Sequence, residues 1–225
     1  MSVWSSISDA VQGIGSSIGQ LLGGTSGVAP EKSVAFTIGM IALSAKMAKA
    51  DGVVTSDEVH AFQQVFQVPE KDAAAVTRVF NLAKQDVAGF ESYAEQVAKL
   101  FDKGSSMLES VLDGLFHIAK ADNAVHEDEL AFLFAIAVIF GFTEKDFARI
   151  KARHVVVAED PYEILGLSPD SSIETVKQHY RKLARELHPD RNIASGMPKE
   201  LVIIATERLA RINAAYNQIT KEAIA

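Results

Sequence analysis

A histidine and an aspartate stand on either side of a proline, at His188, Pro189 and Asp190. An imidazole and a carboxylate this close together could act as a general acid–base pair. No nucleophile accompanies them, so the sequence predicts no enzyme activity for this chain. Pro189 disfavours helical geometry at His188 and fixes its own φ angle. The pattern therefore predicts a stiffened turn that presents His188 and Asp190.

Basic residues surround this turn. Between residues 176 and 191 the chain has five Lys or Arg residues and two acidic residues, a local charge of +3. The basic residues are Lys177, Arg181, Lys182, Arg185 and Arg191. Charges on the outer face of a helix are most often simply solvated. Such a patch could also steer an encounter with an acidic protein surface, and the residues alone leave both interpretations open.

Two apolar stripes predict the helices that position the turn. One covers residues 172–187 and the other residues 199–221, with a loop from 188 to about 197. The stripes consist of Val176, Tyr180, Leu183, Ala184 and Leu187, and of Ala205, Leu209, Ile212, Ala215, Tyr216 and Ile219. Together they predict an antiparallel helical hairpin. A short helix at 161–166 would begin at Pro161 with Asp160 as its N-cap, and Asp170 or Ser171 would cap the second helix.

The segment DPYEILGLSPDSSIETVKQHYRKLARELHPDRN resembles the start of a DnaJ-type J domain, and ERLARINAAYNQIT resembles its third helix. The resemblance covers residues 160–221, within a predicted domain of residues 156–225. It implies that the basic face and the turn contact the ATPase domain and linker of a DnaK-type chaperone. The residues implied in partner binding are Lys177, Tyr180, Arg181, Lys182, Arg185, His188, Pro189, Asp190 and Arg191.

An acidic motif occurs twice further upstream. AKADGVVTSDEV at residues 48–59 and AKADNAVHEDEL at residues 119–130 align without gaps. Each copy ends one apolar helix and starts another, which predicts a duplicated helical hairpin. The motif is similar to half of a calcium-binding loop, but Lys and apolar residues stand where the earlier oxygen ligands would be needed. A complete EF-hand is therefore excluded.

Two interpretations of this motif remain. The structural one is a capping box, in which Thr55 and Glu58 bond each other's backbone N–H groups at a helix start; His126 replaces the Thr in the second copy. The functional one comes from a resemblance of most of residues 31–155 to the TerB family, which is linked to tellurite resistance and acidic metal sites. That resemblance implies a divalent metal at Asp51, Glu58, Asp122 and Glu129.

The whole chain is predicted to be all-α, with a helical bundle at residues 31–155. Helices are expected near 32–50, 56–68, 70–86, 90–102, 105–121, 126–140 and 143–154, separated by turn residues such as Gly104 and Gly141. His117 lies on a largely apolar helix, which favours a histidine in the core. No long alternating pattern predicts a strand.

Residues 1–30 form a Gly- and Ser-rich segment with one apolar face. Its bulky residues follow at helical steps, at Trp4, Ile7, Val11, Ile14, Ile18 and Leu21. Three interpretations stay open: docking on the chain's own bundle, binding of a partner or second copy, and peripheral membrane contact through residues 3–22. The stripe is too polar to span a membrane.

Composition excludes several classes of protein. The formal net charge is −7, and all of this net negative charge lies before residue 160, so nucleic acid is a poor electrostatic partner. The chain has no cysteine, which excludes disulfides and thiolate metal sites. No basic secretory signal starts the chain, so we expect a cytoplasmic protein, with membrane association at the cytoplasmic face if the first segment binds lipid.

A TerB-like domain followed by a J domain resembles the DjlA co-chaperones. This resemblance implies a co-chaperone that stimulates the ATPase of a DnaK-type partner, with the TerB-like domain directing client, location or regulation. The client stays unknown. The alternative is a metal- or stress-responsive sensor whose J domain is only an output.

Overall fold

The computed structural model of the chain describes Ile7 and residues 29–50, 56–66, 68–85, 89–120, 125–155, 160–194, 197 and 199–222. These residues form helices and turns without any strand, which confirms the predicted all-α fold. The helices are α3 (Ala29–Ala50), α4 (Ser56–Val65), the short 3-10 helix η1 (Glu70–Asp72), α5 (Ala73–Gln85), α6 (Phe90–Ala98), α7 (Ser106–Ala119), α8 (Glu127–Ile139), α9 (Glu144–Val155), α10 (Pro161–Leu165), α11 (Ile173–Glu186), α12 (Pro189–Ala194) and α13 (Lys199–Glu222).

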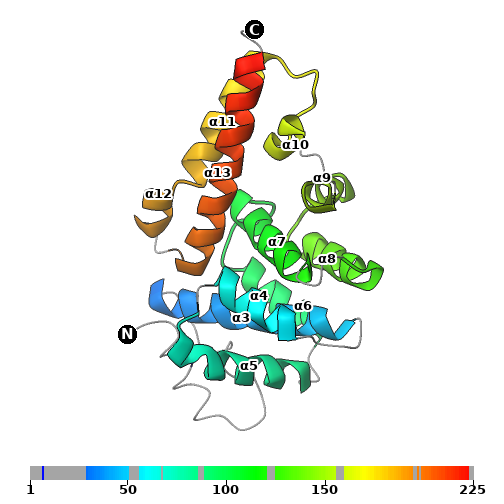
Figure 1. The fold of residues 1–225 in the computed structure, drawn as a ribbon, viewed down its shortest axis with the longest axis vertical. Helices are drawn as coiled ribbons and strands as arrows, with labels where there is room; N and C mark the ends of the chain where they lie inside the picture. The colour runs from blue at the N-terminus through cyan, green and yellow to red at the C-terminus, as the bar shows by residue number, and fades with distance from the viewer. Residues whose placement is uncertain are drawn as a thin grey trace.

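Helices α3 to α9 form a bundle around α3. Helix α3 packs against α5 and α6, and also contacts α7 and α8. Figure 1 shows α3 and α5 crossing the lower part of the molecule, with α7 and α8 above them. Almost every described side chain in the middle of α3 is buried. The predicted long apolar helix is therefore the centre of the bundle.

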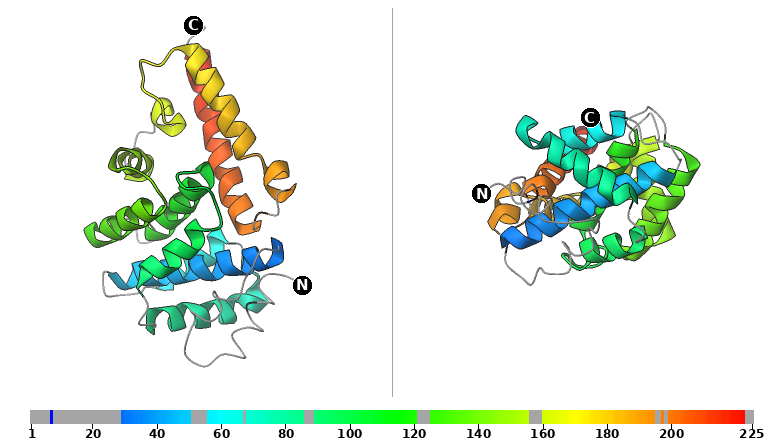
Figure 2. Two further views of the ribbon diagram at one scale, coloured as in Figure 1. Left: turned by 180° about the vertical axis from the view of Figure 1, so that it is seen from behind. Right: turned by 90° about the horizontal axis from the view of Figure 1, so that it is seen from below.

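Helices α11 and α13 form the predicted antiparallel hairpin. They rise away from the bundle, and α10 packs against α13 while α12 lies at the turn of the hairpin (Figures 1 and 2). The Tyr180 and Tyr216 rings stack between the two helices, with centroids 3.9 Å apart. The Tyr180 hydroxyl donates to Oδ1 of Asn213 at 3.1 Å. The turn of the hairpin lies at its end nearest the bundle.

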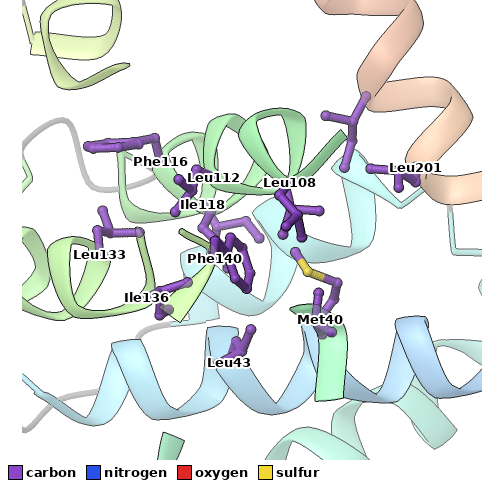
Figure 3. Packing of buried hydrophobic residues seen from close by; sticks show 14 of the residues in the cluster. Met40, Leu43, Leu108, Leu112, Phe116, Ile118, Leu133, Ile136, Phe140 and Leu201 are labelled. Carbon is purple, nitrogen blue, oxygen red and sulfur yellow. The ribbon is translucent and has the colours of Figure 1, made fainter. Parts of the chain in front are cut away.

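The bundle and the hairpin share one apolar core. Figure 3 shows Leu108 of α7 and Met40 of α3 in the same cluster as Leu201, which comes from α13. Leu201 is fully buried. The first turns of α13 therefore pack on the bundle as well as on the rest of the hairpin.

Local caps follow the predictions in part. Asp160 caps α10 as predicted, and its Oδ1 accepts a hydrogen bond from the Tyr162 N–H at 2.9 Å. The predicted cap of α11 is wrong: Ser172 takes this role, accepting from the Thr175 N–H. Ser171 instead closes the preceding turn by donating its N–H to the Ser168 carbonyl.

Two further expectations are wrong. Residues 189–194 were expected in a loop and instead form α12, because a proline is favourable in the first turn of a helix. His117 was expected in the core but is exposed. It lies on the side of α7 that faces a cleft lined also by His60 and Arg211.

Most of the predicted amphipathic segment lies outside the described residues. Ile7 is described and is fully buried in the core cluster. Trp4 and the other apolar residues of the stripe are not among the described residues. Of the helices that the structure describes, none has the length and apolar character needed to cross a membrane.

The packing of α3 on α6 depends on Gly39. A Cβ atom at this position would lie 2.7 Å from Cγ2 of the buried Val97. We expect Gly39→Ala to lower the free energy of unfolding by about 1 kcal/mol, because overpacking costs about 1–3 kcal/mol and exceeds the roughly 1 kcal/mol that Ala gains over Gly in a helix. Urea denaturation measures this. In a Val97→Ala background the same change should become neutral or stabilising, and an equal loss in both backgrounds would contradict the packing argument.

Candidate partner-binding surface

The turn at His188 is organised by its own side chain. Nδ1 of His188 accepts a hydrogen bond from the backbone N–H of Asp190 at 3.2 Å. The His188 carbonyl accepts from the Asn192 N–H at 3.1 Å, which closes the first turn of α12. Pro189 has no N–H that would need a partner in this turn. Histidine and proline thus fix the start of α12 together.

Both polar side chains of this turn face solvent. The side chain of His188 is 53% exposed and that of Asp190 is 89% exposed, and Nδ1 of His188 lies 3.9 Å from a carboxylate oxygen of Asp190. The carboxylate therefore lies close to the imidazole and is accessible to a cation from outside. We call His188, Pro189 and Asp190 the HPD turn.

The basic residues of α11 divide into two sides. At 100° per residue, Lys177, Arg181 and Arg185 fall on the side that continues into His188. Lys182 lies about 100° away from Arg181 and lines a cleft of about 630 Å³ between the hairpin and the bundle, together with Arg191. Lys177 also lies 3.7 Å from Glu174, an exposed ion pair of little energetic weight. Tyr180 differs from the other predicted binding residues because its ring is stacked inside the hairpin.

A buried ion cluster joins the hairpin to the bundle. Glu109 and Asp113 lie one turn apart on α7, and three arginines surround them. Arg149 and Arg153 come from α9, whereas Arg208 comes from α13 of the hairpin. The contacts are Arg149 to Glu109 at 2.8 Å, Arg153 to Glu109 at 2.7 Å and to Asp113 at 3.1 Å, and Arg208 to Glu109 at 2.8 Å and to Asp113 at 3.4 Å. We call these five residues the ion cluster.

Neighbouring polar groups complete the ion cluster. Nη1 of Arg208 donates to the backbone carbonyl of Ser106 at 2.7 Å and to Oγ of Ser110 at 3.3 Å. Nε2 of His154 lies 2.7 Å from Asp113, and the His154 ring stacks on Phe116. The two bonds to Ser106 and Ser110 fix the orientation of the Arg208 guanidinium group.

The electrostatics of the two carboxylates reflects these neighbours. Burial acts to raise the pKa of Glu109, but Arg208, Arg153 and Arg149 outweigh it and lower the pKa to about 2. Burial likewise opposes ionisation of Asp113, whereas Arg153 and the hydrogen bond from His154 hold its pKa well below the usual value. Both acids are therefore ionised at neutral pH.

The four residues predicted to bind metal are only partly described. Asp51 and Asp122 lie outside the described residues, as does the side chain of Glu58. The buried Glu129 has a structural role, since its Oε2 accepts a hydrogen bond from the backbone N–H of His126 at the start of α8. This is the glutamate half of a capping box. Within the described ranges, no three His, Asp or Glu side chains gather as metal ligands would.

Comparison with known proteins assigns both parts of the chain. The model of the family described as tellurite resistance protein TerB matches residues 37–152, which is more than half of the chain. The chain belongs to the TerB family. A second model, described as the DnaJ domain, matches residues 160–223. Helices α3 to α9 thus form a TerB-like domain and α10 to α13 form a J domain, which confirms the resemblances drawn from the sequence.

Several curated relatives have the name co-chaperone protein DjlA. The one from Photobacterium profundum is 26% identical over 221 residues, covering 85% of this chain and 79% of the relative. The one from Vibrio cholerae is 27% identical and covers 88% of this chain and 83% of the relative. The one from Escherichia coli K12 is 24% identical, with 78% and 75% covered. No solved structure matches the chain significantly.

The ion cluster is the feature that the sequence did not reveal. Glu109 and Asp113 lie four residues apart on the largely apolar α7, and Arg149 and Arg153 repeat that spacing on α9. Paired acids on an apolar helix are a signal, because buried carboxylates need cations. Arg208 gives no such signal, since its partners lie about 100 positions away in the chain.

The ion cluster predicts acid sensitivity. The pKa of Glu109 is lower in the folded protein than its ordinary value of 4.5, so its contribution to stability is complete above pH 4.5 and is lost as the pH falls towards about 2. We expect the free energy of unfolding, measured with urea, to fall across this window. Glu109→Gln should make the free energy of unfolding less dependent on pH in this window. It should also lower that free energy by about 3–5 kcal/mol at pH 7, because it leaves buried arginines without their partner. An unchanged pH dependence in that variant would contradict the assignment.

Proposed function

We propose that this chain is a co-chaperone that binds a DnaK-type chaperone through its J domain and stimulates ATP hydrolysis by that partner. The observation that carries the proposal is the exposed HPD turn at the end of a basic helix, on a domain that the DnaJ model matches. The names of the curated relatives support it, because they are co-chaperones. In this proposal the chemistry takes place in the active site of the partner.

Each part of the surface has a separate role in the proposal. The outward charges of Lys177, Arg181 and Arg185 attract an acidic patch on the partner and speed the encounter. Asp190 then pairs with a cation of the partner, and His188 holds the Asp190 backbone N–H in place. Tyr180 stacks on Tyr216 inside the hairpin and so keeps the basic side of α11 in position. The TerB-like domain directs this activity to a client or to a location in the cell, or regulates it. The protein would meet a DnaK-type partner in the cytoplasm.

The proposal predicts a selective loss in an ATPase assay. His188→Gln should abolish stimulation of a DnaK-type chaperone while circular dichroism shows unchanged helicity, because His188 is largely exposed. Arg181→Ala should weaken stimulation by about two- to fivefold and reduce its salt dependence, as expected for one surface charge. Arg78→Ala on the exposed face of α5 is the matched control and should have no effect. Full stimulation by His188→Gln would refute the proposal.

Metal binding by the TerB-like domain is a separate proposal that rests on the duplicated acidic motif. If Asp51, Glu58, Asp122 and Glu129 hold a divalent cation, then Ca²⁺, Mg²⁺, Mn²⁺ or Zn²⁺ should raise the melting temperature of the full chain. Asp51→Asn and Asp122→Asn should remove that rise, while Asp102→Asn, at an exposed acid outside the motif, should leave it intact. No rise with any of the four cations would exclude the site.

A further inference from the structure

Helix α7 of the TerB-like domain has one side of small residues, and helix α13 of the J domain packs on it. Ser106, Ser110 and Gly114 recur at four-residue steps on one side of α7. A Cβ atom at Gly114 would lie 3.0 Å from Cδ1 of Ile204 on α13. The small residues thus let α13 approach closely, and Ile204 becomes buried beside Leu201.

Arg208 holds the docked helix in register. Its side chain is 8% exposed and binds Glu109, Asp113 and the carbonyl of Ser106, all from α7. A second contact runs from Nη2 of Arg211 to the backbone carbonyl of Arg153 on α9, at 3.4 Å. A charge-assisted contact of this kind sets orientation, because a rotated α13 would leave buried charges without partners.

Docking places TerB-like residues beside part of the basic face. Lys182 and Arg191 line one side of the 630 Å³ cleft between the two domains. Asp102, Asp146 and Arg149 of the TerB-like domain line the other side, and the charge of Arg149 is paired with Glu109 at 2.8 Å. Asp146 is held there by Thr143, whose backbone N–H and hydroxyl both donate to its Oδ2. The two acids oppose the field of Lys182 and Arg191, and a cleft of this volume is far too small to admit a folded ATPase domain.

The remaining partner-binding residues point elsewhere. Arg181, Arg185, His188 and Asp190 are exposed and do not line the cleft. Lys182 and Arg191 are exposed to solvent as well, but they line the cleft, so that the TerB-like domain stands in the way of a folded partner. The docked J domain therefore offers a partner only one side of its basic helix. The other side, at Lys182 and Arg191, faces acids of its own chain.

We propose that the α7–α9 face of the TerB-like domain is a docking surface for the chain's own J domain, and that this docking withholds Lys182 and Arg191 from the chaperone partner. The inference rests on the proposed function, since it concerns access to the same surface. Release of α13 gives the partner both sides of the basic helix and removes the nearby acids. The TerB-like domain thereby restrains the J domain until a client or another signal separates the two.

The restraint is tested by opening the interface in the full chain. Arg208→Glu places a like charge beside Glu109, whereas Gly114→Leu inserts a wedge from the TerB-like side and leaves the J domain unaltered. Both variants should lower the concentration needed for half-maximal ATPase stimulation by about two- to fivefold, the value of one or two regained surface contacts. Lys221→Glu, at an exposed position of α13, repeats the charge change of Arg208→Glu and should have no effect. An unchanged or higher half-maximal concentration in both opening variants would overturn the inference.

A second substitution identifies the withheld side. Lys182→Ala should change ATPase stimulation little in the otherwise unaltered chain, where the domains are docked. In either opening variant it should cancel much of the decrease in the half-maximal concentration. Equal effects of Lys182→Ala in docked and opened chains would also overturn the inference. His188→Gln separates the two proposals. If this variant still stimulates the partner ATPase, the proposed function is refuted. If His188→Gln abolishes stimulation but the opening variants behave like the wild type, only the restraint is refuted.

Separation of the domains has its own readout. The chain has no cysteine, so Ala131→Cys on α8 and Gln218→Cys on α13, both exposed, provide two sites for spin labels. The distance distribution should be narrow in the parent chain and broad in the opening variants, with helicity retained. A distribution that stays narrow in a folded Gly114→Leu chain with improved stimulation would overturn the inference, because the improvement would then not come from release of α13.

Discussion

Glu109 and Asp113 are ionised inside the protein, and a buried carboxylate is tolerated only where cations and hydrogen-bond donors surround it. The TerB-like domain supplies two of the three arginines from α9, and the J domain supplies the third, Arg208. Helices α7, α9 and α13 must therefore keep one mutual arrangement for the charges to balance. The relative orientation of the two domains follows from this electrostatic requirement.

The same arrangement leaves the HPD turn accessible. The docked side of α13 is not the side that packs on α11, so the surface of α11 is free of the interface except along the edge at Lys182. The stacked pair of Tyr180 and Tyr216 holds the hairpin together from within. Internal packing of the J domain and its docking on the TerB-like domain thus use different faces. A partner can meet the turn without first dissolving the interface.

The sequence predicted the features that depend on residues close to one another in the chain. Helical periodicity located the elements, and Asp160 and the hairpin stripes lie where the pattern placed them. The predictions failed where several caps of similar quality compete, as at Ser172, and where a proline can start a helix as well as interrupt one, as at Pro189. His117 was misplaced because an apolar helix next to a cleft still has an exposed side.

Contacts distant in the sequence could not be predicted in this way. An acidic pair on α7 indicates that cations must come from elsewhere, but nothing in the pattern distinguishes Arg208 from the solvated Arg181 or Arg185. Only the close approach allowed by Gly114 makes one arginine of the J domain internal to the TerB-like domain. The candidate surface itself was predictable because exposed charges on an amphipathic helix follow from periodicity, whereas the side withheld by docking depends on the tertiary structure.

Helix α13 buries side chains in the cores of both domains. Ala205, Ile212 and Ile219 are buried in the hairpin, whereas Ile204 and Arg208 are buried against α7. The boundary between the family matches, between residues 152 and 160, is therefore not a boundary of the core. Separating the domains exposes Leu201 and Ile204 to water at the same time as it breaks the ion cluster. The exposed apolar residues and the broken ion pairs all belong to the first half of α13. A signal that opens the interface would therefore have to act on this half. The second half of α13 can stay packed on α11 and keep the hairpin folded.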